Sequence, residues 1–392
     1  MPRRILILNE RDLRNPLAGG AEVHLFETFG RMARQGHQVT VLVASFPGSS
    51  REEIVDGLRV IRLANRYLYY FLAPIVARRL RRQEGFDVVV DVLCKLPFFS
   101  PWFIPGPCVA VVHHLFGSTA FQQVNPAVAL VTWLAEKLIP AAYRNCWSVA
   151  VSPSTRDDLV ERGLPRDKIL VVPNGVDCDQ FHPEPSRRSD TPMILWLGRA
   201  ETYKRVDLVL RAMQQLRQSV PGVRLVIVGD GSATKALRTL ASQLGVADIV
   251  DFLGFVDSGL KVMLLQRAHV LANTSEKEGW GLTVLEGAAC ATPTVASNVP
   301  GLRDSVCDAE TGVLVPHGDV PALIDALQGL LADEARREAM AAKARAWALR
   351  FRWETGAADM ERVLEAAIRG GPVTGLESPF ASTPATRPAA AP

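Results

Sequence analysis

The segment from Ser275 to Glu286 carries the most informative chemistry of the chain. Two carboxylates, Glu278 and Glu286, stand eight positions apart, with the turn Gly279-Trp280-Gly281 between them and an apolar helix pattern after it. The glycines let the backbone approach a ligand closely, and a helix N-terminus offers unpaired N–H groups to an anion. Carboxylates beside an anion-binding helix end suit a ligand that carries both hydroxyls and phosphates, such as a nucleotide sugar.

Two cations follow the first strong strand of the second half of the chain. Arg199 and Lys204 come just after Leu197-Gly198, where open α/β sheets bind ligands at the carboxyl ends of their strands. They could neutralise the charge that develops on a departing diphosphate. A solvated basic loop is the alternative, and the acidic segment in the same half of the chain favours ligand binding.

The first half of the chain contributes two weaker candidates. Gly19-Gly20 lies between the first strand and its helix and could hold a phosphate, although such pairs are more often plain junctions. The chain lacks the G-x-G-x-x-G spacing there, which argues against a nicotinamide or flavin. His113-His114 follows the strand Val109–Val112, so His113 could hydrogen-bond a sugar hydroxyl in a cleft, or be a structural loop residue.

The chain offers little for a metal ion. Asp177-Cys178-Asp179 matches a D-x-D pattern, but it follows a Pro-Asn-Gly turn that no strand places in a cleft, so we interpret it as structural. No carboxylate or cysteine near His113-His114 completes a metal site. Glu52-Glu53 and Asp157-Asp158 are interpreted as solvated helix charges.

Short apolar strand patterns alternate with helical patterns over nearly the whole chain, which predicts two doubly wound parallel sheets. The strongest helix patterns are Ala21–Gln35, Val206–Ser219, Leu260–Arg267, Leu282–Cys290 and Ala335–Arg350. The expected strands are Ile5–Leu8, Val39–Val43, Val60–Leu63, Val88–Val92, Val109–Val112, Ser148–Val151, Leu170–Val172, Ile194–Leu197, Leu225–Val228, Val250–Leu253, Val270–Ala272, Thr294–Ala296 and Val313–Val315.

The distribution of residue types along the chain predicts the domain boundaries. We predict an N-terminal domain at 1–182, a proline-rich linker at 183–192 and a C-terminal domain at 193–350. A helix at 351–370 is expected to pack back on the N-terminal domain, and the Pro/Ala-rich segment 371–392 is expected to be disordered.

The net charge, the cysteine content and the lengths of the apolar segments argue against several classes of function. A net charge of +3 over 392 residues gives no reason to expect nucleic acid as a partner. Six scattered cysteines without metal-binding spacing suggest free thiols and a cytoplasmic protein. The N-terminus reads as a first strand rather than a signal peptide, and no apolar run is long enough to span a membrane.

The segment Arg59–Arg82 holds seven arginines and no acidic residue, around the apolar and aromatic run Tyr67–Ala77. A helix of this composition suits an anionic membrane surface. A core helix with an arginine-rich flank is the alternative, although an anionic bilayer or a phosphate-bearing acceptor would explain the excess of arginine.

Taken together, the motifs resemble the retaining glycosyltransferases of family 4. The resemblance runs from Ile5 to about Arg369, and its signature is the E-x7-E pair Glu278 and Glu286. Weaker matches in the same order are Gly19-Gly20-Ala21-Glu22, Pro173-Asn174-Gly175-Val176-Asp177, Gly198-Arg199 with Lys204, Val228-Gly229-Asp230-Gly231 and Val299-Pro300-Gly301. It implies the GT-B fold, in which an acceptor-binding and a donor-binding Rossmann-like domain face a central cleft.

The resemblance implies a role for each matching position. The donor phosphates are expected at Gly19, Gly20, Arg199, Lys204 and the amides of Leu282 and Thr283. The transferred sugar is expected at His113, Glu278 and the turn Gly279-Trp280-Gly281, and the ribose at Glu286. No metal and no cofactor beyond the nucleotide-sugar co-substrate is expected. Trp280 stands where the family usually has phenylalanine, and His114 where aspartate is common.

The implied reaction retains the anomeric configuration of the sugar. The acceptor hydroxyl would attack from the face that the diphosphate leaves, and a diphosphate oxygen would take its proton. A glycan, a glycolipid or another lipid-linked molecule is the expected acceptor, with the protein peripheral on the inner membrane face. The alternatives are a sugar-nucleotide epimerase on the same fold and a transferase for a soluble small acceptor.

Overall fold

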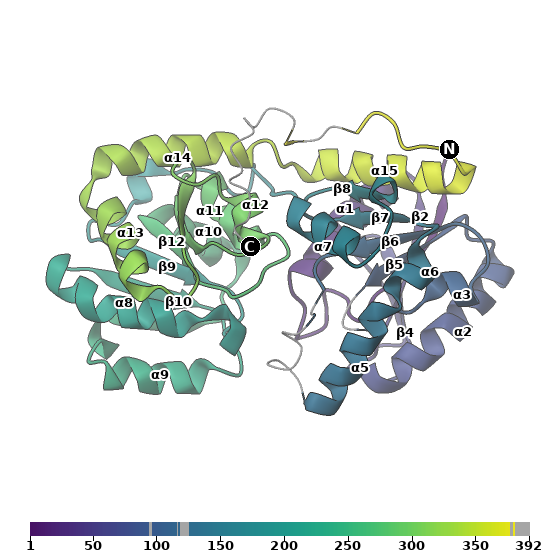
Figure 1. The fold of residues 1–392 in the computed structure, drawn as a ribbon, viewed down its shortest axis with the longest axis horizontal. Helices are drawn as coiled ribbons and strands as arrows, with labels where there is room; N and C mark the ends of the chain where they lie inside the picture. The colour runs from purple at the N-terminus through teal and green to yellow at the C-terminus, as the bar shows by residue number, and fades with distance from the viewer. Residues whose placement is uncertain (94–95, 116, 118–124, 377–378, 381–392) are drawn as a thin grey trace.

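The computed structural model describes residues 1–93, 96–115, 117, 125–376 and 379–380. Two α/β domains lie side by side, each built on one twisted sheet with helices on both faces, and the last helix of the chain lies on the first domain (Figure 1). The prediction of two doubly wound sheets is confirmed.

The first domain holds an eight-stranded sheet in the order β3-β4-β2-β1-β5-β6-β7-β8. All neighbours are parallel except β3 and β4, and buried valines, leucines and isoleucines on both faces explain why these strands read as continuous apolar runs. The strands are β1 (Arg4–Leu8), β2 (Gln38–Val43), β3 (Glu52–Val55), β4 (Leu58–Arg62), β5 (Val88–Leu93), β6 (Cys108–Val112), β7 (Trp147–Ala150) and β8 (Ile169–Val171). The helices are α1 (Gly20–Arg34), α2 (Arg66–Glu84), α3 (Ser100–Phe103), α5 (Pro126–Lys137), α6 (Ile139–Tyr143) and α7 (Pro153–Glu161), with a 3₁₀ turn at Arg166–Lys168.

The second domain holds a parallel six-stranded sheet in the order β11-β10-β9-β12-β13-β14. The strands are β9 (Met193–Leu197), β10 (Arg224–Val228), β11 (Val250–Gly254), β12 (Val270–Asn273), β13 (Thr294–Ser297) and β14 (Gly312–Val315). The helices are α8 (Val206–Ser219), α9 (Thr234–Gln243), α10 (Ser258–Arg267), α11 (Leu282–Ala289), α12 (Leu302–Ser305), α13 (Val320–Ala332) and α14 (Glu334–Ala348), with 3₁₀ turns at Pro185–Arg187, Thr202–Lys204 and Ala247–Ile249.

The antiparallel edge strand β3 was not expected. Glu52 and Glu53 open this strand, so their interpretation as helix charges is wrong. The strand pairs with β4 through a two-residue turn at Asp56-Gly57, where both residues have positive φ. The remaining predicted strands all form, with ends shifted by one or two residues.

The chain passes between the domains twice. It leaves the first domain after β8 through residues 173–192 and returns from α14 to α15 (Trp353–Arg369). The helix α15 lies on the first domain, where Arg3 bonds Glu365 at 2.6 Å and Arg31 bonds Glu354 at 2.8 Å. The segment 371–392, expected to be disordered, lies largely outside the described residues.

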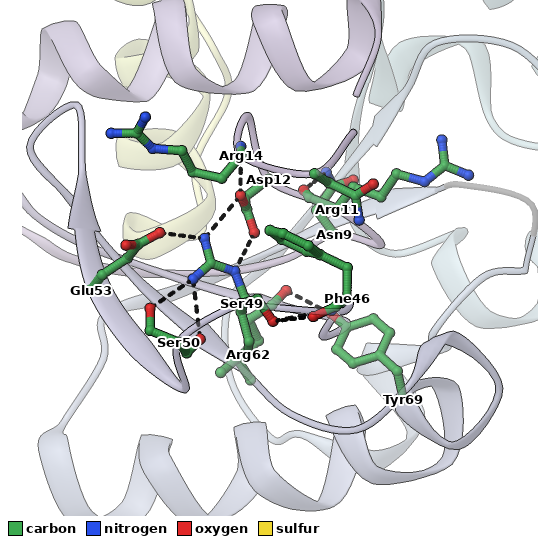
Figure 2. Close-up of polar contacts among 12 residues, drawn as sticks. Asn9, Arg11, Asp12, Arg14, Phe46, Ser49, Ser50, Glu53, Arg62 and Tyr69 are labelled. Carbon is green, nitrogen blue, oxygen red and sulfur yellow. Dashed lines mark hydrogen bonds and ion pairs between the residues drawn. The ribbon is translucent and has the colours of Figure 1, made fainter. Parts of the chain in front are cut away.

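A buried ion pair fixes the loop between β1 and α1. The guanidinium of Arg62 donates to both carboxylate oxygens of Asp12, at 2.8 and 3.0 Å, and also to Glu53 at 2.6 Å (Figure 2). The Arg62 and Asp12 side chains are 1% and 0% exposed. Asp12 also accepts from the Arg14 amide, so the pair holds the loop that leads to Gly19 and Gly20.

We predict that Asp12→Ala lowers the free energy of unfolding of the first domain by about 3 kcal/mol, because it leaves a buried guanidinium short of a partner. Asp248→Ala is the matched control, since Asp248 forms a similar pair with Arg217 on the surface and its loss is expected to leave the free energy of unfolding nearly unchanged. Urea titration followed by tryptophan fluorescence measures both, and equal small losses would contradict the prediction.

Candidate active site

A cavity of about 670 Å³ opens between the two domains. Its volume is in the range of small-molecule sites, which is about 300–1,000 Å³. The first domain lines it with the end of its β1–α1 loop and the carboxyl end of β6, and the second with the loops that follow β9 and β12. Predicted residues in the lining are Gly19, Gly20, His113, Arg199, Lys204, Glu278, Gly279, Trp280, Gly281, Leu282 and Thr283.

Lys204 and Glu278 form an ion pair on the second-domain wall of the cavity. The Lys204 ammonium donates to Glu278 Oε1, which lies 2.8 Å from the hydroxyl of Ser275. Burial disfavours the charged ammonium, but the adjacent Glu278 outweighs it and raises the pKa of Lys204. Lys204 is therefore a fixed positive charge in the cavity at neutral pH.

The N-termini of α1 and α11 face each other across the cavity. A Cβ added to Gly20, the first residue of α1, would lie 3.0 Å from the side chain of Leu282, the first residue of α11. Gly281 precedes α11 with a φ of 88°, in the left-handed region that favours glycine. An anion between these two helix ends would meet unpaired N–H groups from both domains.

Arg199 extends from the second domain toward the N-terminus of α1. Its guanidinium donates to the Leu17 carbonyl at 3.3 Å, and a Cβ on Gly19 would lie 2.8 Å from its Nη2 atom. The Gly19 amide itself donates to Glu22 at 2.7 Å, so the Glu22 carboxylate caps the start of α1. Burial raises the pKa of Glu22.

His113 lies at the end of β6 and is largely buried. Burial lowers the pKa of His113 to about 3, with the neighbouring His114 as a second cause, so its ring is neutral at physiological pH. Its Nε2 atom lies 3.1 Å from Nδ1 of His24 on α1. A Cβ on Gly279 would lie 2.5 Å from the His113 carbonyl oxygen, so His113 also touches the acidic loop of the opposite domain. His114 lines the cavity too.

Glu286 is the one predicted residue outside the cavity lining. It lies on the second turn of α11, where its Oε1 accepts from Lys261 of α10 at 2.5 Å. Its Oε2 atom is buried and has no hydrogen-bond partner among the described residues. A ligand hydroxyl would satisfy this oxygen, so Glu286 fits a polar ligand at the edge of the cavity.

The structure also shows what surrounds Trp280 and the D-x-D segment. Trp280 is buried and packs on Phe351 with ring centroids 5.1 Å apart, so the larger ring is accommodated in the core behind the loop. Asp177 uses Oδ1 to accept from the amides of Asp179 and Gln180, both at 3.0 Å. The D-x-D segment thus stabilises its own turn.

The sequence reasoning missed several residues of the lining. Glu10 comes shortly after β1, and the tendency of ligands to bind at the carboxyl ends of strands, which indicated His113, could also have indicated Glu10. Arg66, Tyr203 and Phe255 also line the cavity but carry no local signal, because only the assembled fold brings them there.

The chain matches two family models: residues 18–180 match Glycosyltransferase Family 4, and residues 177–347 match Glycosyl transferases group 1. It is 33% identical to a D-inositol 3-phosphate glycosyltransferase of Xylanimonas cellulosilytica, over 91% of this chain and 93% of that protein. It is 29% identical to a GDP-mannose-dependent alpha-(1-6)-phosphatidylinositol monomannoside mannosyltransferase of Mycolicibacterium smegmatis, over 89% and 95% of the two chains.

Solved structures share the fold. Sucrose-phosphate synthase from Thermosynechococcus elongatus superposes with a TM-score of 0.81 at 22% identity, covering 94% of this chain and all of that one. HepE from Anabaena, in complex with UDP and glucose, gives a TM-score of 0.76 at 19% identity, over 93% and 100% of the two chains.

We predict that Gly279→Ala destabilises the protein by about 1–3 kcal/mol, because the new methyl group would overlap the His113 carbonyl of the opposite domain. Gly371→Ala is the control, since a Cβ there would meet nothing within 4 Å. Thermal denaturation compares the two variants with the wild type, and an unchanged Tm for Gly279→Ala would show that the domains do not meet at this loop.

Proposed function

The chain belongs to family 4 of the glycosyltransferases and has their two-domain fold, and on this premise we propose that it is a retaining, metal-independent enzyme of a membrane surface. Its donor is a nucleotide-diphosphate sugar, and its acceptor is a hydroxyl of a glycolipid or another lipid-linked glycan. The observation that carries this proposal is that two helix N-termini, Arg199 and Lys204 line the same interdomain cavity.

The diphosphate is placed between α1 and α11. Gly20, Leu282 and Thr283, whose amides are near the helix N-termini, line the cavity together with the cations Arg199 and Lys204. A diphosphate gains negative charge as its bond to the sugar breaks, and fixed positive groups stabilise that charge without reorganising. This set of groups supplies what a metal ion supplies elsewhere.

Donor binding would replace the hydrogen-bond acceptors that Lys204 and Arg199 already have in the site. Lys204 pairs with Glu278 and Arg199 with the Leu17 carbonyl, so a diphosphate would replace both acceptors. Glu278 is then released to accept hydrogen bonds from the sugar hydroxyls, and neutral His113 can bond a further hydroxyl. The buried Oε2 of Glu286 suits a ribose hydroxyl of the nucleotide.

Retention of the anomeric configuration is the proposed stereochemical outcome. The acceptor hydroxyl attacks the anomeric carbon on the face that the diphosphate leaves, the bond from that carbon to the diphosphate oxygen breaks, and this oxygen takes the acceptor proton. The reaction then depends on stabilising the leaving group, the role assigned to Arg199, Lys204 and the two helix ends. The tight interdomain contact at Gly279 helps to exclude water, which would otherwise hydrolyse the donor.

The proposed membrane surface lies on the first domain. Tyr67, Leu68, Phe71, Leu72 and Ile75 recur along one face of α2 and are 40–75% exposed. The helices α3 and α5 add further exposed apolar side chains at Trp102, Phe103, Val128, Leu130, Val131 and Leu134. These helices lie together on the side of the first domain shown at the lower right of Figure 1, where α3 contacts α2 and α6, and α6 contacts α5.

The arginines of the segment Arg59–Arg82, which spans the end of β4 and most of α2, divide into two groups. Arg59, Arg62 and Arg66 pair with acidic residues, so this part of the basic run has partners inside the domain. Arg78, Arg79 and Arg82 are exposed and border a shallow hollow with Ile75. None of the described helices is long and apolar enough to cross a bilayer. Exposed arginines beside an apolar face suit an anionic membrane surface, which we place on the cytoplasmic side.

The names of the relatives specify two kinds of acceptor: one names phosphatidylinositol monomannoside, a glycolipid, and the other names D-inositol 3-phosphate, a soluble molecule. A soluble acceptor is the alternative, and the exposed apolar face of the first domain favours the membrane-associated one. A sugar-nucleotide epimerase would give product without any acceptor. Measuring donor turnover with and without acceptor therefore distinguishes an epimerase from a glycosyltransferase.

The donor series is found first with a panel of UDP-, GDP-, ADP- and TDP-sugars in EDTA, in which selective binding raises the Tm. With the donor so identified, Lys204→Ala and Glu278→Ala are each expected to lower transfer by at least about 100-fold while Tm stays within a few degrees. Lys235→Ala, on the outer face of the second domain, is the control. NMR of the product should show the anomeric configuration of the donor. An inverted product, activity lost in EDTA, or near-normal rates in either site variant would each refute a part of the proposal.

Membrane binding is tested by flotation with vesicles that contain anionic lipid. The variant Arg78→Glu, Arg79→Glu and Arg82→Glu is expected to remain soluble while the wild type floats. Arg81 is left unchanged because it donates to the Pro107 carbonyl and is partly buried. A control with the same charge change on the second domain, Arg211→Glu, Lys235→Glu and Arg238→Glu, should float normally. Failure of the wild type to bind vesicles would overturn the membrane assignment and favour a soluble acceptor.

A further inference from the structure

A second histidine stands behind His113. His24 lies on α1 and is 2% exposed, and its Nδ1 atom is 3.1 Å from Nε2 of His113. The rings are edge to face, with centroids 4.9 Å apart and an interplanar angle of 79°. We propose that His24 is a positioning residue for sugar transfer, which fixes the tautomer and the ring orientation of His113. The inference rests on the proposed function.

His24 and His113 form one hydrogen bond, in which only one of the two rings can be the donor. Burial lowers the pKa of both histidines, so both rings are neutral, and a neutral imidazole has one donor and one acceptor nitrogen. At 3.1 Å, two lone pairs or two N–H groups would repel, so one ring must donate to the other. The tautomer of His113 is therefore dictated by that of His24.

This arrangement decides which atom of His113 meets a ligand. Because Nε2 is engaged by His24, Nδ1 is the remaining ring nitrogen, and no other described residue bonds it. His113 lines the cavity opposite the acidic loop. A single tautomer gives Nδ1 one fixed role toward a sugar hydroxyl, either donor or acceptor, whereas a mixture would leave part of the enzyme unable to bond it.

The surroundings hold both rings in place. His24 is one helical turn after Gly20, so the helix that offers its N-terminus to the diphosphate also carries the partner of His113. Trp353, the first residue of α15, packs beside His24 with ring centroids 6.1 Å apart. The hydroxyl of Thr155 donates to the His113 carbonyl at 3.1 Å, which fixes the backbone while His24 fixes the ring.

Three variants test the proposal. His24→Leu removes the partner of His113, and His24→Asn keeps an amide at the place of Nδ1 that can donate or accept. His37→Leu is the matched control: His37 is also buried and also packs near α15, where it pairs with Glu361 at 3.2 Å, but it lies beyond the other end of α1.

The first readout is independent of activity. Correlations between ring protons and ¹⁵N nuclei in histidine-labelled protein report the tautomer of each ring. We expect one tautomer of His113 in the wild type and in His37→Leu, and a mixture in His24→Leu. An unchanged His113 pattern in His24→Leu would overturn the proposal, whatever the enzyme activity.

The second readout is kinetic, with the donor identified by the thermal-shift panel. We expect kcat to fall at least about tenfold in His24→Leu, with the donor Kd changed by less than about threefold, and to recover within about threefold of wild type in His24→Asn. A normal kcat in His24→Leu would overturn the positioning role. If wild type turns over no nucleotide sugar, the proposed function fails, and the NMR result still decides whether His24 sets the tautomer.

Discussion

Two helix N-termini come close together at the cavity, and this electrostatic constraint shapes the rest of the site. Like ends of helix dipoles repel, and Arg199 and Lys204 add positive charge to the same place. Acceptors inside the protein offset this charge: Glu278 for Lys204, the Leu17 carbonyl for Arg199 and Glu22 for the start of α1. A diphosphate can replace the first two, so the site is already arranged around an anion.

Close approach of the two domains depends on residues without side chains. Cβ atoms at Gly20 and Gly279 would lie 3.0 and 2.5 Å from Leu282 and from the His113 carbonyl. Where the chain crosses back, a Cβ on Gly175 would lie 2.4 Å from the Trp353 amide. The glycines at these three places therefore act through close approach as much as through turn geometry.

Much of this could be predicted from the sequence, for physical reasons that differ between elements. Buried parallel strands have continuous apolar sequences, so the sequence predicts β1, β5 and β9 directly. His113 and Arg199 could be predicted because ligands bind at the carboxyl ends of such strands. The edge strand β3 was not visible, because Glu52 and Glu53 lie on an exposed edge and carry no apolar pattern. His24 lies inside a helix pattern, where nothing local distinguishes it from a core residue. Its pairing with His113 exists only because α1 packs against the end of β6.

The path of the last helix has a consequence for how the protein is made. Met360, Val363 and Leu364 of α15 are fully or almost fully buried in the core of the first domain, beside Phe29, Met32 and Val90. A ribosome must therefore complete the second domain before the first can bury this surface. During synthesis the first domain would display an unfinished apolar patch, and its native state would await a segment translated more than 300 residues after its first strand. The two domains are thus interdependent in biogenesis, although each has its own sheet.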